Sequence, residues 1–190
     1  MGRPRQFSEE RAVDAAMRVF WSQGYEATST QDLCAATGLG RSSIYNTFRS
    51  KHDLFTRSLE HYFAITSATL DEIVASGGSA SARLRRLLDI TVEEAAGQGR
   101  DGCFAVNCTV ELGPRDEAVD AMLNRERDRR IDVLGDLVRE GQRDGEFPGA
   151  DPLAVANYLM SVIGGIRISA RSGAAGPVLQ GIADVAKAAL

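Results

Sequence analysis

The residues best suited to recognition chemistry form a run of hydrogen-bonding side chains at positions 41–47. If this run is a helix, Ile44 and Phe48 lie four residues apart on one face, which we expect to pack inward. The other positions then present donors and acceptors outward, as recognition of base edges in a DNA groove requires. The outward positions are Arg41, Ser42, Ser43, Tyr45, Asn46 and Thr47.

Three cations of the N-terminal part lie at places suited to the DNA backbone and grooves. Lys51 opens a long predicted helix, where unpaired backbone N–H groups and a cation together suit a phosphate. Arg3 and Arg5 precede the first predicted helix in what we expect to be a flexible arm. Such arms can enter a minor groove. These basic side chains favour a nucleic acid as the partner.

Two short helices and one preceding helix must position these residues. Apolar side chains recur with helical spacing over residues 8–24. Ser29 and Asp32 have the spacing of a capping box and begin a short helix that ends at Gly38, where a glycine permits a sharp corner. A second short helix then covers residues 41–47. The pattern predicts a helix-turn-helix whose second helix lies in the major groove of double-stranded DNA.

The composition fits a soluble globular protein with a basic N-terminal part. Of the 190 residues, 44% are hydrophobic and 25% are charged, which are ordinary proportions for this class. The net charge is −4, but its distribution is uneven. Residues 1–52 carry seven Arg and Lys against five Asp and Glu, whereas residues 53–190 carry 15 against 21. The chain is therefore a basic head on an acidic body.

Few side chains are available for metal or catalytic chemistry. The cysteines, Cys34, Cys103 and Cys108, form no CxxC pair, and there are two histidines, so we expect no disulfide framework, no metal site and no cofactor. An enzyme is the alternative class, but no catalytic nucleophile, base and orienting group stand out. The N-terminus has no secretory signal, and the apolar stretch 153–170 is interrupted by polar residues. We expect a cytoplasmic protein without a membrane partner.

Helical periodicity extends along nearly the whole chain, and alternating strand patterns are absent. We therefore predict an all-α fold of about nine helices. Within it, residues 8–55 resemble the DNA-binding domain of the TetR family of bacterial repressors. The similarity is carried by the stretches 24–33 (GYEATSTQDL), 36–48 (ATGLGRSSIYNTF) and 50–55 (SKHDLF).

The resemblance implies a domain division and a set of DNA contacts. Residues 1–52 would form the helix-turn-helix domain, and residues 53–190 a helical domain for ligand binding and dimerisation. Two departures, Gly40 where the family often has serine and Thr47 where it has His or Tyr, leave the operator sequence open. The implied base-facing residues are Arg41, Ser42, Ser43 and Asn46, with Thr47 beside them. The implied phosphate contacts are Thr28, Thr30, Tyr45 and Lys51.

The stretch 102–111 is similar to a G-C-[LFM]-x-x-N-x-x-x-[EL] signature in one branch of the family. The resemblance implies a mostly apolar effector pocket in the second domain. The alternative for these residues is core packing. The candidate pocket residues are Tyr62, Phe63, Cys103, Phe104, Asn107, Cys108, Glu111 and Met122.

Cys103 has two possible roles. It lies at the N-terminus of a predicted helix, where the helix dipole favours a thiolate, and the matching cysteine of some family members responds to electrophiles or oxidants. Cys103 could therefore be a redox sensor. The alternative is a small apolar residue at a packed helix start.

Family members bind DNA as two-fold dimers, usually through their last two helices. Residues 153–168 are apolar around most of the helix, which suits burial against a second copy or, alternatively, inside their own chain. The candidate interface residues are Val155, Leu159, Val162, Ile163, Ile166, Leu179 and Ile182. These expectations together describe a homodimeric repressor that binds a palindromic operator and is released by a small-molecule effector, or by thiol chemistry at Cys103.

Overall fold

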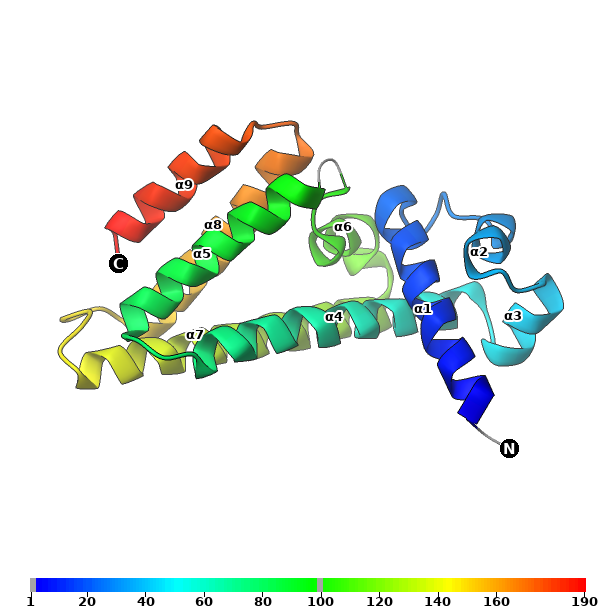
Figure 1. Cartoon of the computed structure of the whole chain (residues 1–190), viewed down its shortest axis with the longest axis horizontal. Helices are drawn as coiled ribbons and strands as arrows, with labels where there is room; N and C mark the ends of the chain where they lie inside the picture. The colour runs from blue at the N-terminus through cyan, green and yellow to red at the C-terminus, as the bar shows by residue number, and fades with distance from the viewer. Residues whose placement is uncertain (1–2, 99–100) are drawn as a thin grey trace. The chain divides into compact units, whose positions relative to one another are not determined.

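The computed structural model describes residues 3–98 and 101–190, with the side chains of residues 9–97 and 101–190. Within these ranges the chain has nine α-helices, one short 3-10 helix and no strand (Figure 1). The predicted all-α fold is confirmed. The elements are α1 (Arg3–Gln23), α2 (Thr30–Thr37), α3 (Arg41–Thr47), α4 (Lys51–Ala75), α5 (Ala80–Gln98), α6 (Phe104–Glu111), η2 (Gly113–Arg115), α7 (Glu117–Arg143), α8 (Pro152–Arg171) and α9 (Gly176–Ala188).

The chain divides into two compact units. The first unit contains Met1–Ser67 together with Asn107–Asp120, and the second contains Ala68–Val106 together with Ala121–Leu190. This division differs from the predicted change of domain after residue 52. The difference arises because α4 continues without interruption past that position, and because the segment 107–120 joins the N-terminal helices.

The helix-turn-helix of the first unit follows from local signals. The Ser29 hydroxyl accepts the Asp32 N–H at 3.2 Å, and the Asp32 carboxylate accepts the Ser29 N–H at 2.8 Å, which completes a capping box at the start of α2. Gly38 ends α2 with a φ of 69°, in the left-handed region that glycine tolerates. Helix α2 contacts both α1 and α3, so the three helices form one packed head (Figure 1).

Helix α1 begins at Arg3 rather than at the predicted Ser8. The backbone around Arg3 and Arg5, which we predicted as a flexible arm, is therefore part of the first helix. Pro4 is compatible with this start, because proline has no N–H to contribute and the first turn of a helix needs none. The side chains of Arg3 and Arg5 lie outside the described residues.

The second unit is built around three mutually contacting helices, α5, α8 and α9 (Figure 1). Helix α8 starts with Asp151 as N-cap, whose side chain accepts the Leu153 N–H at 3.1 Å, and with Pro152 in the first turn. Among the described residues, α8 is the one helix long and apolar enough to cross a membrane. One face of α8 packs in the core of the second unit, as expected for a core helix.

Candidate nucleic-acid interface

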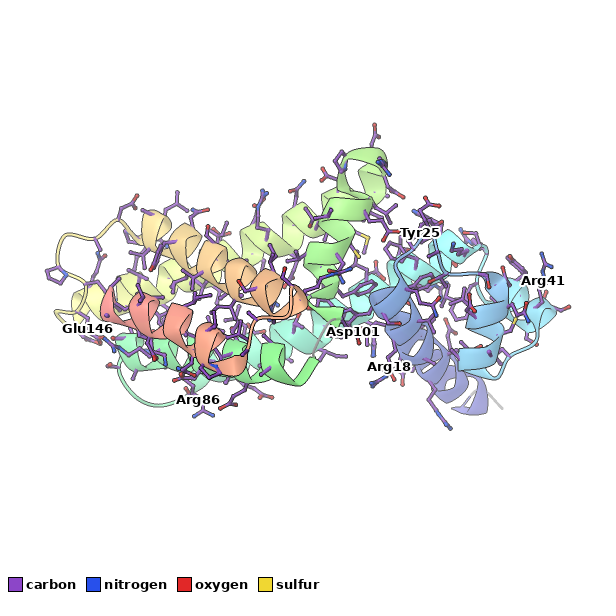
Figure 2. The ribbon with its side chains drawn as sticks, turned by 90° about the horizontal axis from the view of Figure 1, so that it is seen from above. Arg18, Tyr25, Arg41, Arg86, Asp101 and Glu146 are labelled. Carbon is purple, nitrogen blue, oxygen red and sulfur yellow. The ribbon has the colours of Figure 1, made fainter. Side chains whose placement is uncertain are left out.

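Helix α3 separates its apolar side chains from its polar ones. Ile44 and Phe48 are 1% and 0% exposed and anchor this seven-residue helix in the head, because a helix so short is not stable alone. Arg41 points outward from α3 (Figure 2). Five predicted DNA-contacting side chains are thus exposed together on one short helix, namely Arg41, Ser42, Ser43, Tyr45 and Asn46; Thr47 is half-buried.

The hydroxyls of Tyr45 and Thr30 connect the two helices of the motif. Tyr45 Oη and Thr30 Oγ1 are 3.1 Å apart, within hydrogen-bond distance, and join α3 to the first turn of α2. The Arg41 guanidinium carbon lies 5.9 Å from the centre of the Tyr45 ring, at the outer limit of a cation–π contact. The structure therefore brings two predicted phosphate contacts together beside a predicted base contact.

Lys51 is the first residue of α4, as predicted, and its side chain has a defined support. The ammonium nitrogen lies 4.5 Å from the centre of the Tyr25 ring. This ring in turn packs on Phe55, with 4.8 Å between the ring centres. A cation at a helix start, held over an aromatic face, has the charge and the neighbouring backbone N–H groups that a phosphate needs.

Thr28 differs from the other predicted phosphate contacts. Its side chain is 1% exposed, and its hydroxyl donates a hydrogen bond of 2.6 Å to the Gly24 carbonyl oxygen. A phosphate needs an accessible donor, and this hydroxyl is both buried and already donating. Thr28 is therefore a buried residue whose hydrogen bond stabilises the turn between α1 and α2.

A second group of contacts within the first unit was not anticipated from the sequence. The Glu111 carboxylate accepts the backbone N–H groups of Tyr25 and Glu26 at 3.0 and 2.8 Å. His52 Nε2 and Asp116 Oδ2 are 2.6 Å apart. We expected Glu111 to be a ligand-pocket residue, whereas its carboxylate is taken up by these two amides.

Asp116 is held by more than one hydrogen bond. Partial burial raises its pKa, but hydrogen bonds from the N–H of Val119, from His52 and from the N–H of Ala118 outweigh burial, so that the pKa lies below its usual value. The N–H groups of Ala118 and Val119 lie at the start of α7, each 3.1 Å from Asp116 Oδ1. Asp116 therefore caps α7 and contacts the start of α4 at the same time.

Two sequence comparisons bear on the head and on the remainder of the chain. Residues 12–57 match the family described as "Bacterial regulatory proteins, tetR family", and residues 80–175 match "Tetracyclin repressor-like, C-terminal domain". The chain belongs to the TetR family. This family consists of transcriptional regulators, which confirms the predicted class and confirms that the protein is not an enzyme.

Named relatives agree with this membership. The HTH-type transcriptional repressor ComR of Escherichia coli (strain K12) is 31% identical over 176 residues, which cover 91% of this chain and 84% of ComR. CifR, a TetR family transcriptional regulator solved as a cysteine mutant with 26-bp double-strand operator DNA, is 29% identical with a TM-score of 0.87, covering 98% of this chain and 99% of CifR. The reduced form of E. coli NemR has a TM-score of 0.86 at 19% identity, covering 96% of each chain, which shows a shared fold.

The predicted effector-pocket residues of this TetR family protein are divided between the two units. The first unit holds Tyr62, Phe63, Asn107, Cys108 and Glu111, and the second holds Cys103, Phe104 and Met122. A groove of about 450 Å³ between α1 and α4 of the first unit is lined by Glu9, Glu10, Val13, Arg57, Glu60, His61 and Ala64. None of the predicted pocket residues lines this acidic groove. The effector pocket that was predicted from the 102–111 signature therefore stays a prediction.

Cys103 has a cationic neighbour in the second unit. Its side chain is 3% exposed, and Arg167 Nη1 lies 3.5 Å from its sulfur. The other terminal nitrogen of Arg167 lies 3.2 Å from a carboxylate oxygen of Glu94. Residues of α5 and α8 therefore hold a guanidinium against this thiol.

Most of the predicted dimer residues face the interior of their own chain. Leu159, Ile163, Ile166 and Leu179 are at most 5% exposed and belong to the core of the second unit. Val155, Val162 and Ile182 are partly buried against that core. The alternative reading, an intrachain core helix, therefore describes these four buried side chains. The exposed apolar side chains of α8 and α9 are instead Leu153, Tyr158, Ile168, Val178 and Val185.

Proposed function

We propose that this TetR family protein is a transcriptional repressor, which binds a palindromic operator as a homodimer and releases it when a small-molecule effector binds. The observation that carries the proposal is the exposed polar face of α3, fixed to the head by Ile44 and Phe48. Support comes from relatives, since ComR is named a repressor and CifR was solved with operator DNA.

The side chains of α3 have the chemistry to read bases in the major groove. Arg41 can donate two hydrogen bonds to guanine, and Asn46 can pair with adenine through a donor and an acceptor. Ser42 and Ser43 supply adaptable hydroxyls beside them. Around this reading surface, Thr30, Tyr45 and Lys51 would contact phosphates, which fixes the register of the helix without selecting a sequence.

The homodimer would form through the outward faces of α8 and α9. Ile168, Val178 and Val185 are 53%, 55% and 72% exposed on these two helices, and the spacing of Val178 and Val185 puts them on one face of α9. A Cβ atom added to Gly164, Gly165 or Gly181 would meet no atom within 4 Å, so these positions allow another helix to approach closely. A two-fold dimer presents two copies of α3 to half-sites about 34–36 Å apart.

Release by an effector would be a shift between two states of the dimer, of which only one matches the operator spacing. An effector can cause such a shift only through its higher affinity for the mismatched state. Tyr62, Phe63, Asn107 and Cys108, which all lie in the first unit, remain proposed pocket residues. Glu111 is left out of the proposed pocket, because its carboxylate already accepts two backbone N–H groups.

Thiol sensing at Cys103 is a second candidate, and one observation favours it. The Arg167 guanidinium at 3.5 Å provides the cationic surroundings in which cysteine acts as a nucleophile. An electrophile would alkylate the sulfur, with loss of the thiol proton to solvent. The added group would enlarge a side chain that is 3% exposed, so the packing around α6 would have to change.

Binding to DNA from the region upstream of the protein's own gene tests the proposal. Fluorescence anisotropy at two salt concentrations should show specific, salt-sensitive binding by the wild-type protein. The Tyr45→Ala and Lys51→Ala double variant should lose it. Arg86→Ala is a matched control, because it removes an exposed cation from α5, in the other unit (Figure 2). Equal affinity of the double variant and the wild type would contradict the assigned contacts.

A further inference from the structure

The Glu111 carboxylate binds the turn that follows α1. It accepts two consecutive backbone N–H groups, those of Tyr25 and Glu26, at 3.0 and 2.8 Å. Gly24 precedes them with a φ of 86°, and a Cβ atom at Gly24 would lie 2.9 Å from a Glu111 oxygen. Glycine at this position therefore allows both the left-handed φ of the turn and the close approach of the Glu111 carboxylate.

Tyr25 links this turn to Lys51, the proposed phosphate contact. Its backbone N–H is bound by Glu111, while its ring carries the Lys51 ammonium group at 4.5 Å. The ring is fixed from the other sides by Phe20 and Phe55, with ring-centre distances of 6.1 and 4.8 Å. A displacement of the Tyr25 backbone would therefore move the surface on which Lys51 rests.

A second carboxylate of the same segment holds the neighbour of Lys51. Asp116 Oδ2 lies 2.6 Å from His52 Nε2. The His52 ring also lies edge-on to the Tyr25 ring, with 6.2 Å between the ring centres. Glu111 thus binds the backbone of the residue whose ring carries Lys51. Asp116 binds the side chain of the residue that follows Lys51 in α4.

We propose that the segment 107–120 positions Lys51 for its phosphate, through Glu111 on the Tyr25 turn and Asp116 on His52. The inference rests on the proposed DNA-binding function. Glu111 and Asp116 are positioning residues, since neither touches DNA in this account. Charge alone gives the opposite expectation, because removing an anion near a phosphate-binding lysine would strengthen DNA binding. Positioning instead requires that removing Glu111 weakens it.

The test uses the full-length protein and a fluorescein-labelled duplex enriched from random-sequence DNA by the wild-type protein. Glu111→Ala should weaken binding about tenfold, the scale of one lost charge-assisted contact. The slope of log K against log salt should fall by about 0.9 per head, the value of one phosphate contact. Glu117→Ala is the matched control, because it removes an exposed anion from the same segment; it should bind at least as tightly as the wild type.

A double-variant cycle with Lys51→Ala separates positioning from a general loss of structure. If Glu111 acts through Lys51, adding Glu111→Ala to Lys51→Ala should cost little further affinity. Should Glu111→Ala fail to fold by circular dichroism, Glu111→Gln replaces it. Glutamine keeps one acceptor oxygen and sets an NH₂ group against the second amide, so a loss of about threefold is expected.

Each outcome is decisive. Unchanged or tighter binding by both Glu111 variants, or losses that add fully to that of Lys51→Ala, would overturn the positioning role while leaving DNA binding intact. An unaltered salt slope for Lys51→Ala alone would remove Lys51 as the phosphate contact, and the inference would fail with it. Enrichment of no duplex by the wild-type protein would overturn the proposed function itself.

Discussion

Replacing Thr28 with valine tests whether the Thr28 hydroxyl stabilises the turn between α1 and α2 or contacts a phosphate. Valine nearly matches the shape of threonine but has no hydroxyl, so the Gly24 carbonyl loses the donor that lies 2.6 Å away. Because Thr28 is 1% exposed, water cannot easily replace that donor. The change should therefore act on the stability of the head and leave the number of phosphate contacts unaltered.

The magnitude follows from one neutral hydrogen bond. Such a bond contributes about 1 kcal/mol to the free energy of unfolding, and an acceptor left unpaired raises the cost toward about 2 kcal/mol. For a chain of this length, a loss of about 1 kcal/mol lowers the melting temperature by about 2–4 °C. Because the head stays folded after a loss of this size, DNA affinity should stay within about twofold of the wild type.

Urea denaturation and an anisotropy titration of DNA binding at fixed salt, performed on the same protein preparations, measure stability and affinity. Thr28→Ser keeps the hydroxyl and should retain most of the hydrogen-bond energy. Thr30→Val is the contrasting variant, since Thr30 is half-buried beside Tyr45 and the loss of its hydroxyl should weaken DNA binding. A Thr28→Val protein with unchanged stability and clearly weaker DNA binding would show that the Thr28 hydroxyl contacts a phosphate.

Three further predictions concern acid stability, assembly and sensing. The pKa of Asp116 is lowered by folding, so its stabilising contribution is complete above about pH 4, the unfolded value, and is lost as the pH falls through the folded value. Asp116→Asn should therefore lower the free energy of unfolding at pH 7, and by less as the pH falls below about 4. Val185→Asp should convert a dimer to a monomer in analytical ultracentrifugation, because the exposed α9 face would then bury a charge. Cys103→Ser should keep operator affinity within about twofold, because Cys103 belongs to the second unit, which holds none of the proposed DNA contacts. It should abolish release by electrophiles such as quinones if the thiol is the sensor.

Each of these predictions has a control and a contrary result. An Asp116→Asn effect on the free energy of unfolding that does not shrink as the pH falls below about 4 would contradict the lowered pKa of Asp116. Val110→Asp places the same charge on an equally exposed apolar position of α6, so monomers from both variants would argue against an α8–α9 interface. Quinone-induced release that survives Cys103→Ser would leave reversible effector binding as the mechanism.

Local signals in the sequence were sufficient for the helix-turn-helix. The Ser29–Asp32 capping box and Gly38 define the limits of α2 from residues that lie within a few positions of one another. The spacing of Ile44 and Phe48 likewise identifies the inward face of α3. Such patterns depend on helix geometry alone, so they can be read without knowledge of the tertiary structure.

The contacts of Glu111 could not be predicted in this way. The hydrogen bond from Tyr25 N–H joins residues 86 positions apart, and no local periodicity encodes which turn a carboxylate will meet. The same limit applies to α8, where apolar spacing correctly shows a buried face but does not show what covers it. Leu159 and Ile163 are covered by their own chain, because α5 and α9 pack against α8.

Selection of bound fragments from random-sequence DNA measures operator recognition by α3 without assuming an operator sequence. We expect the wild-type protein to enrich one inverted repeat, with half-site centres one helical turn or a multiple of it apart, about 34–36 Å per turn. Asn46→Ala should then relax specificity at a single position in each half-site. Enrichment of no sequence, or of an asymmetric site that Asn46→Ala leaves unchanged, would contradict the account.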